Sequence, residues 1–279
     1  MKVRYSIWDP SGNITALVES PIPVERQSAV AAELMARHPT VEQVGFVSWQ
    51  AEGGSDAALR MAGGEFCGNA SMSAAALLQS RLERAAPAGA WITRSLRVSG
   101  AKQPVAVRLC PQAEGVYAGG VCMPKARAIV ETAFRWGSLR GMLPLVRMEG
   151  IAHVIVSDAS PLFALKDQPA EAEEAVKAWC AALDAEGLGL MFLARGEGNP
   201  RLSPLVYIPG SATVFWESSC ASGSSAVGMA LAAGSGRAQR LTLAQPGGCL
   251  QVESDPESGE TWLYGRTALL GQYDTEIRG

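Results

Sequence analysis

The sequence is poor in the residues and motifs that mark several large functional classes. Only two of its 279 residues are histidines, and none of its six cysteines forms a Cys-x-x-Cys pair. A zinc site with the usual cysteine and histidine spacing has little to draw on, so the sequence predicts no metal. The patterns G-x-G-x-x-G and G-x-x-x-x-G-K-[ST] do not occur, and nucleotide binding therefore has no support.

Charge and long apolar runs are also scarce. Charged residues make up 18% of the chain and the formal net charge is −3, so the chain lacks the basic surface that nucleic acids require. Apolar runs such as residues 187–194 (GLGLMFLA) are too short to span a bilayer, and the N-terminus lacks a secretory signal pattern. We expect a soluble cytoplasmic protein with no nucleic-acid or membrane partner, whose cysteines are more often reduced than bridged.

Hydrophobic residues, by contrast, form 48% of the chain and can fill a large core. In the first half, alternating and helical patterns predict a hairpin, a helix, a strand and a second helix, over residues 3–20, 24–39, 43–49 and 69 to about 84. In the second half, the same patterns predict a strand, a helix, a strand and a small-residue helix, over residues 153–159, 171–187, 188–194 and 218–234.

This repeated order indicates an internal duplication into two αβ halves. The predicted N-terminal half covers residues 1–118 and is joined by a returning C-terminal strand at 265–279. The predicted C-terminal half covers residues 119–264, and the region 101–144 is rich in strands. Two equivalent halves would place two equivalent helix starts across one cleft, where ligands favour binding.

Two cysteines stand in matched contexts, each before a small-residue helix. The sequence reads GGEFCGNAS around Cys67 and WESSCASGSSA around Cys220. The N–H groups at a helix start bind a carboxylate, and their field lowers the pKa of a nearby thiol. If the two helix starts converge, two sulfurs flank the carbon attached to that carboxylate. This geometry suits removal of a proton from one face of an α-carbon and delivery to the other, which predicts racemisation or epimerisation without a cofactor.

These motifs resemble those of the diaminopimelate epimerase-like superfamily of cofactor-independent racemases and epimerases. The resemblance covers essentially the whole chain and is carried by EFCGNA, CASG and the N-terminal segment SGNITALVES. It implies an α+β fold of two pseudo-symmetric halves, each a sheet wrapped around a central helix, with the active site in the cleft between them. It also implies Cys67 and Cys220 as catalytic residues, no cofactor, and a small amino-acid substrate; a homodimer is compatible with it.

The motifs and the resemblance together give the substrate-binding candidates Asn13, Gln43, Glu65, Gly68, Asn69, Glu217, Ala221, Ser222 and Gly223. Two departures bear on the substrate. The Asn-Pro-His segment of the diaminopimelate enzymes reads GIAHV here, and Ile208 and Pro209 stand where those enzymes carry a Glu-Arg pair. Without a bidentate arginine, a distal carboxylate cannot be held in the same way. The sequence around Cys67 resembles the histidine racemase branch more closely, so histidine or another amino acid without a distal carboxylate is the expected substrate. His153 is interpreted as a strand histidine.

Other functions stay open at this point. The chain could be a diaminopimelate epimerase with altered contacts, or a non-catalytic amino-acid-binding relic, although both cysteines are present. Residues 99–102 (SGAK) match the Ser-x-x-Lys pattern of serine acyl enzymes, but the accompanying Ser-Asp-Asn and Lys-Thr-Gly sequences do not occur. A pyridoxal enzyme is compatible with the five lysines and would absorb visible light.

Overall fold

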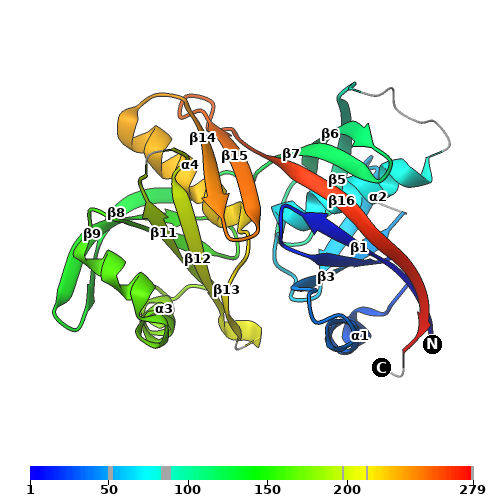
Figure 1. Ribbon diagram of the computed structural model, residues 1–279, viewed down its shortest axis with the longest axis horizontal. Helices are drawn as coiled ribbons and strands as arrows, with labels where there is room; N and C mark the ends of the chain where they lie inside the picture. Colours follow the sequence, from blue (N-terminus) through cyan, green and yellow to red (C-terminus); the bar gives the residue numbers. More distant parts are fainter. Residues whose placement is uncertain (50–52, 83–88, 197, 212, 278–279) are drawn as a thin grey trace. The chain divides into compact units, whose positions relative to one another are not determined.

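The protein forms two compact units in a computed structural model that describes residues 1–49, 53–82, 89–196, 198–211 and 213–277 (Figure 1). Unit 1 comprises Met1–Cys122 and Tyr264–Gly279, and unit 2 comprises Met123–Leu263. The sequence analysis set the first boundary after residue 118, inside strand β7 (Val116–Cys122); the whole strand belongs to unit 1.

Unit 1 is a sheet that closes on itself around one helix. Its first seven strands are neighbours in chain order: β1 (Lys2–Pro10), β2 (Thr15–Val18), β3 (Gln43–Ser48), β4 (Ala57–Met61), β5 (Ile92–Val98), β6 (Val105–Ala113) and β7. The last strand of the chain, β16 (Thr261–Glu276), pairs with both β7 and β1. The C-terminal strand therefore completes the N-terminal unit.

Helix α2 (Gly68–Arg81) is the core of unit 1. Twelve of its fourteen residues are buried, and it contacts strands on all sides of the sheet. Its small serine and alanine side chains suit this position because a closed sheet leaves a narrow interior. Helix α1 (Val24–Arg37) lies outside the sheet, where Val30 and Leu34 pack against Phe46 in a separate apolar cluster.

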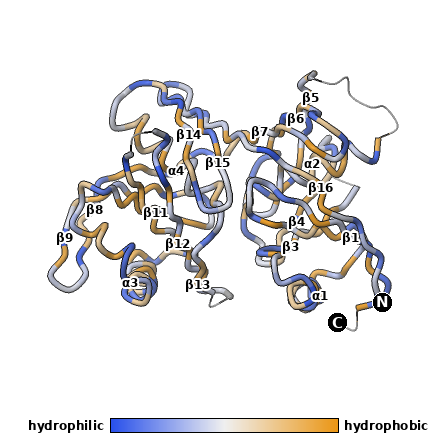
Figure 2. Tube along the Cα trace, viewed as in Figure 1, coloured by the Kyte–Doolittle hydropathy of each residue, from blue (hydrophilic) through white to orange (hydrophobic). Residues whose placement is uncertain are grey.

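Unit 2 also places one central helix against its sheet. Helix α4 (Ala221–Ser235) is largely buried and contacts six strands of the unit. The strands in spatial order are β15 (Gly248–Ser254), β14 (Gln239–Gln245), β12 (Arg201–Ile208), β11 (Leu188–Ala194), β10 (Ala152–Ser157), β9 (Leu139–Arg147) and β8 (Ala128–Trp136). Strand β13 (Thr213–Trp216) pairs with β12, and the 3-10 helix η2 (Pro209–Ser211) connects the two. Figure 2 shows the continuous hydrophobic stretch of β11 crossing this unit, as expected of a strand that is buried almost throughout.

The strand pairings show the internal repeat directly. In unit 1, β2 and β3 are parallel and joined by the outer helix α1; in unit 2, β10 and β11 are parallel and joined by η1 (Pro161–Asp167) and the outer helix α3 (Pro169–Ala182). The next pairs, β3–β4 and β11–β12, are antiparallel. Strands β4 and β5, which precede and follow α2 in the chain, are parallel. Strands β12 and β14 are also parallel; β12 and β13 precede α4 in the chain, and β14 follows it. The two units share one order of elements, as the repeated pattern predicts.

The elements predicted from the sequence are present, with shifted ends. The predicted end of the second helix near Arg84 lies outside the described residues. The sequence analysis named no strand for β4, β5 or β12–β15. Of these, β13 has only four residues and β12 contains Pro204. Among the described residues, no helix is long and apolar enough to cross a membrane.

Candidate active site

Cys67 is the N-cap residue of α2. Its Sγ accepts a hydrogen bond from the Ala70 N–H at 3.4 Å, and the Ser71 hydroxyl donates to the Cys67 carbonyl at 2.7 Å. The thiol donates to the side-chain oxygen of Gln43 at 3.2 Å. The sulfur is therefore fixed at the positive end of a buried helix, beside the first main-chain N–H groups, which include that of Gly68.

A chain of amides orients Gln43 towards this thiol. Gln43 Nε2 donates to Asn13 Oδ1 at 2.6 Å, and Asn69 Nδ2 donates to the same oxygen at 3.2 Å. Asn13 Nδ2 in turn donates to the Glu42 carboxylate at 2.6 Å. Because the Gln43 nitrogen is engaged behind it, its oxygen faces Cys67. Glu42 is the one residue of this network that was not a candidate. Its place beside Gln43 in the chain is the only sequence signal for its role here.

Glu65 stands apart from this network. Burial raises the pKa of its carboxyl group, while a hydrogen bond to its own N–H and the charge of Arg60 lower it. Its carbonyl accepts a hydrogen bond from the Ser99 hydroxyl at 2.8 Å, and Ser99 Oγ accepts from the Met61 N–H at 2.9 Å. The Ser99 hydroxyl is thus engaged as donor and acceptor with backbone groups. This geometry does not favour Ser99 as the nucleophile of a serine hydrolase.

Cys220 occupies the matching position in unit 2, as the N-cap residue of α4. Its side chain is buried; its Sγ accepts from the Gly223 N–H at 3.4 Å and lies 3.6 Å from Ser222 Oγ. The Ser224 hydroxyl donates to the Cys220 carbonyl at 2.6 Å, as Ser71 does for Cys67. The N–H of Ala221 is the first of this helix. Each unit therefore builds the same thiol-capped helix start.

The surroundings of the two thiols differ in charge. Burial raises the pKa of Cys220 well above its ordinary value, and the adjacent Glu217 carboxylate raises it further by its charge and by a hydrogen bond. The Gly223 N–H and the Ser222 hydroxyl act in the opposite direction, because they donate to the sulfur. Glu217 thus lies beside Cys220 and favours the protonated thiol; its role in substrate binding stays a prediction.

His153 lies closer to this site than its interpretation as a strand histidine implies. It is in β10, fully buried, with Nε2 3.0 Å from Ser222 Oγ. Nδ1 has no hydrogen-bond partner among the residues that the structure describes, and it faces Gly189 on β11, where a Cβ atom would collide with the ring. Burial lowers the pKa of His153 to about 3, so the ring is neutral. The sequence signal for His153 was its place in GIAHV, the segment that stands where the diaminopimelate enzymes carry Asn-Pro-His.

The structure therefore gathers the candidates into two clusters, one per unit. Unit 1 brings together Asn13, Gln43, Cys67, Gly68 and Asn69, with Glu65 nearby but outside the hydrogen-bonded network. Unit 2 brings together the remaining candidates, which are Glu217, Cys220, Ala221, Ser222 and Gly223. Within the part of the chain that the structure describes, no group of histidine, cysteine and acidic side chains could hold a metal ion.

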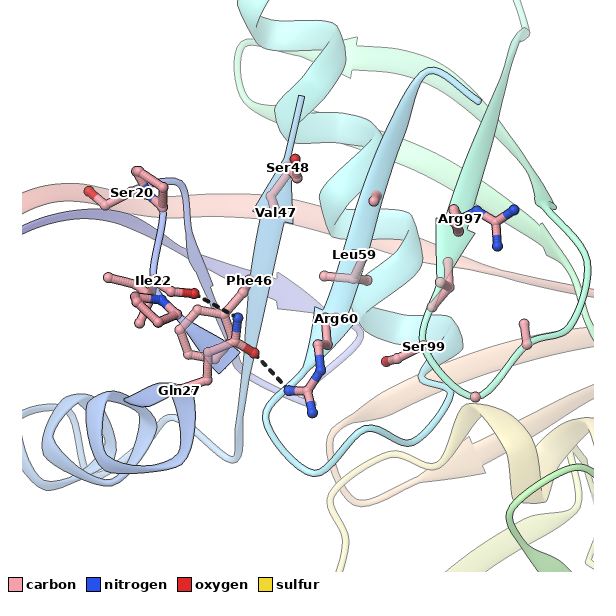
Figure 3. Close-up of a pocket in the computed structure, with 16 residues that line it drawn as sticks. Ser20, Ile22, Gln27, Phe46, Val47, Ser48, Leu59, Arg60, Arg97 and Ser99 are labelled. Atoms are coloured by element: carbon pink, nitrogen blue, oxygen red, sulfur yellow. Dashed lines mark hydrogen bonds between the residues drawn. The ribbon is translucent and has the colours of Figure 1, made fainter. Parts of the chain in front are cut away.

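A separate groove of about 700 Å³ lies on the outer face of β3, β4 and β5 (Figure 3). Arg60 extends into it and donates to Gln27 Oε1 at 2.7 Å, while Gln27 Nε2 donates to the Ile22 carbonyl at 3.1 Å. These bonds attach the start of α1 to β4. None of the candidate site residues is among the described residues that line this groove.

Comparison with known proteins points to one family. The family model described as histidine racemase CntK N-terminal domain matches residues 2–263. A histidine racemase of Staphylococcus aureus strain Mu50 is 31% identical over 289 residues, which cover 99% of this chain and 93% of that protein. A histidine racemase of Fusobacterium nucleatum subsp. nucleatum is 29% identical over 256 residues, covering 88% of each chain.

Solved structures resemble the fold. A predicted epimerase from Pseudomonas aeruginosa superposes with a TM-score of 0.68 at 15% identity, covering 99% of both chains. A hydroxyproline epimerase from Agrobacterium vitis, solved with bound trans-4-hydroxy-L-proline, gives a TM-score of 0.65 at 13% identity and covers 100% of this chain and 93% of that one. At these identities the likeness establishes a shared mixed α/β fold. The resemblance to the histidine racemase branch inferred from the sequence around Cys67 is confirmed.

Proposed function

The chain belongs to the histidine racemase CntK family and is an amino-acid racemase, and we propose that it inverts the α-carbon of histidine with Cys67 and Cys220 as paired bases. One observation carries the proposal. Each unit has a single central buried helix, and each of these helices has a cysteine as its N-cap residue, with Sγ accepting the N–H three residues on. A matched pair of this kind is difficult to explain by core packing alone.

The helix starts supply the binding site for the α-carboxylate in this proposal. The first N–H groups of a helix have no partner within the helix and carry partial positive charge, so they bind anions. We assign this role to the N–H groups of Gly68 and Asn69 in one half and of Ala221 and Ser222 in the other. The proposal requires the α-carbon of the bound substrate to lie between the two sulfurs. The same donors stabilise the charge that develops when the α-proton leaves.

The proton balance requires one thiolate and one thiol at the start of each turnover. The thiolate removes the α-proton, and the opposite thiol delivers its own proton to the other face, so the two sulfurs exchange protonation states. Two thiolates at one site would repel each other, so the pair titrates together. The proposed reaction uses no cofactor: the two sulfurs carry the proton, and the helix N–H groups stabilise the charge left on the substrate. The reverse reaction uses the same groups with their roles exchanged.

Histidine is proposed as the substrate on two grounds. The relatives that match nearly the whole chain are named histidine racemase. The chain also has Ile208 and Pro209 in place of the Glu-Arg pair expected of a diaminopimelate enzyme, so no bidentate arginine is available there for a distal carboxylate. The amide network around Asn13 and Gln43 lies beside Cys67 and offers uncharged hydrogen-bonding groups to the amino acid.

The test is racemisation of L- and D-histidine by the purified protein, with meso-diaminopimelate as a second substrate. We expect activity on histidine and little on diaminopimelate. Cys67→Ala and Cys220→Ala should each lose at least about 10³-fold in kcat. Cys249→Ala is the matched control, because this cysteine is exposed on β15 and should be dispensable. Full activity of either Cys67→Ala or Cys220→Ala would refute the paired-base proposal.

A further inference from the structure

Gln245 makes a closed ring of hydrogen bonds around the Cys220 backbone. It is the last residue of β14 and is buried, with 9% of its surface exposed. The Cys220 N–H donates to Gln245 Oε1 at 2.8 Å, and Gln245 Nε2 donates to Ser224 Oγ at 3.0 Å. Ser224 Oγ then donates to the Cys220 carbonyl at 2.6 Å. The peptide groups on both sides of Cys220 are therefore fixed by one side chain and its serine partner.

This ring determines where the sulfur points. Cys220 is the N-cap residue and has an extended backbone, with φ −117° and ψ 109°. Its own N–H lies outside the helical hydrogen-bond pattern, and a buried N–H without a partner is unfavourable. Gln245 supplies that partner. With both neighbouring peptide planes held, Sγ remains within 3.4 Å of the Gly223 N–H.

Unit 1 has a related arrangement at the corresponding place. Ser99 directly follows β5, the first strand after α2, and Gln245 ends β14, the first strand after α4. The Ser99 hydroxyl donates to the carbonyl of Glu65, two residues before Cys67. In unit 2, the Gly247 N–H donates to the Ser218 carbonyl, two residues before Cys220, at 2.7 Å. In both units the turn after this strand holds the segment that leads into the cysteine, and Gln245 additionally holds the cysteine itself.

We propose that Gln245 is a positioning residue of the racemase, which orients the Cys220 sulfur through its ring of hydrogen bonds with Cys220 and Ser224. The inference rests on the proposed catalytic role of Cys220. It goes beyond that role because Gln245 contacts neither sulfur, lies 25 residues away in the chain, and acts through the backbone. In this proposal Cys220 transfers the α-proton of the substrate, and Gln245 fixes the position of the Cys220 sulfur.

The test compares two glutamines of the same strand. Gln245→Met removes both ring bonds at similar volume, whereas Gln239→Met alters the other end of β14, where Gln239 Nε2 bonds to the exposed Ser235 hydroxyl. For Gln245→Met we expect kcat to fall by about 10²-fold, because a small displacement of a reacting group has an effect of this size. The Cys220 sulfur also loses its fixed N–H donor, so its iodoacetamide alkylation should shift to higher pH, read at each cysteine by peptide mass spectrometry. Gln239→Met should match the wild type in both measurements.

A shift of the alkylation profile that is confined to Cys220 distinguishes a positioning role from general destabilisation. The alkylation profile of Cys67 should be unchanged in Gln245→Met, because Cys67 belongs to the other unit. A folded Gln245→Met protein with a wild-type Cys220 profile and wild-type kcat, or one in which both cysteine profiles shift equally, would overturn the inference. If Gln245→Met does not fold, Ser224→Ala removes the second and third bonds of the ring and should shift the Cys220 profile in the same direction; a wild-type profile would again overturn the inference. A fully active Cys220→Ala would instead refute the proposed function, and the two failures are therefore distinguishable.

Discussion

At the scale of single residues, the two sulfurs share a backbone geometry but differ in their neighbours. The Cys67 thiol donates to the neutral amide oxygen of Gln43, whereas Cys220 faces the carboxylate of Glu217 and the hydroxyl of Ser222. A carboxylate beside a buried thiol disfavours the thiolate. The protonation of Cys220 therefore depends on a neighbouring charge, and this dependence can be measured.

Replacing Glu217 should make the Cys220 thiolate easier to form. The Glu217 carboxylate raises the pKa of Cys220, so Glu217→Gln removes a cause of that rise and the pKa should fall. The pH at which Cys220 becomes alkylated by iodoacetamide should accordingly move downwards. Glu253→Gln serves as the control, because Glu253 forms a partly exposed ion pair with Arg240 on the neighbouring strand. An unchanged or upward-shifted Cys220 profile in Glu217→Gln would show that this carboxylate does not govern the thiol.

His153 should make the protein sensitive to mild acid. Its pKa is about 3 in the folded protein and near 6.5 when unfolded, so the unfolded chain binds the proton more readily. The stability associated with the neutral ring is present above pH 6.5 and is lost as the pH falls. Between about pH 5.5 and pH 4, the free energy of unfolding of the wild type should fall relative to that of His153→Gln by about 1.4 kcal/mol per pH unit. Urea unfolding of both proteins across this range measures the difference; parallel curves would contradict it.

At the scale of elements, the central helices combine two requirements. They must fit in the interior of a sheet, and they must present a helix start to the active site. Small residues meet the first requirement: α4 packs Gly228 directly against Val252 of β15, so closely that a Cβ atom there would collide with it. The N-cap cysteine meets the second. A change that lifts the helix away from the sheet also displaces the sulfur.

Two glycines of α4 should respond oppositely to alanine. Gly228→Ala places a methyl group against Val252 and Ser254, and overpacking of this kind lowers the free energy of unfolding by about 1–3 kcal/mol. Gly234→Ala, on the same helix, meets no atom within 4 Å and should raise it by up to about 1 kcal/mol, since alanine favours the helix. Denaturant unfolding of the two variants measures both changes. Destabilisation of similar size at the two positions would contradict the packing described for α4.

The sequence predicted the helices and the cysteine positions well because these depend on local signals. A small-residue turn that runs into an alanine-rich stretch follows both Cys67 and Cys220, and the helices begin at Gly68 and Ala221. Contacts between distant segments left no such signal. Nothing near Gln245 in the chain indicates that its side chain reaches Cys220, and nothing near His153 indicates Ser222. These contacts arise from the packing of the start of α4 against β14 and β10.

At the scale of the whole molecule, the duplication accounts for the chemistry in this proposal. A single unit supplies one thiol, one helix start and one half of a carboxylate site, and proton transfer across an α-carbon requires both. The repeated order of strands and helices was readable from the sequence because it recurs at the level of whole segments. The sequence analysis predicted a C-terminal strand that returns to the N-terminal half. In the structure β16 pairs with β1.

The central claim is that two sulfurs on opposite faces of the substrate exchange the α-proton, and deuterium labelling tests it most directly. L-Histidine is incubated with the protein in D₂O, and the α-position of both enantiomers is followed by NMR after chiral separation at early time points. A two-base enzyme delivers a different proton from the one it removed. We predict that newly formed D-histidine carries deuterium while the recovered L-histidine carries little. Equal labelling of both enantiomers from the first time points would show a single exchanging base and would contradict the account.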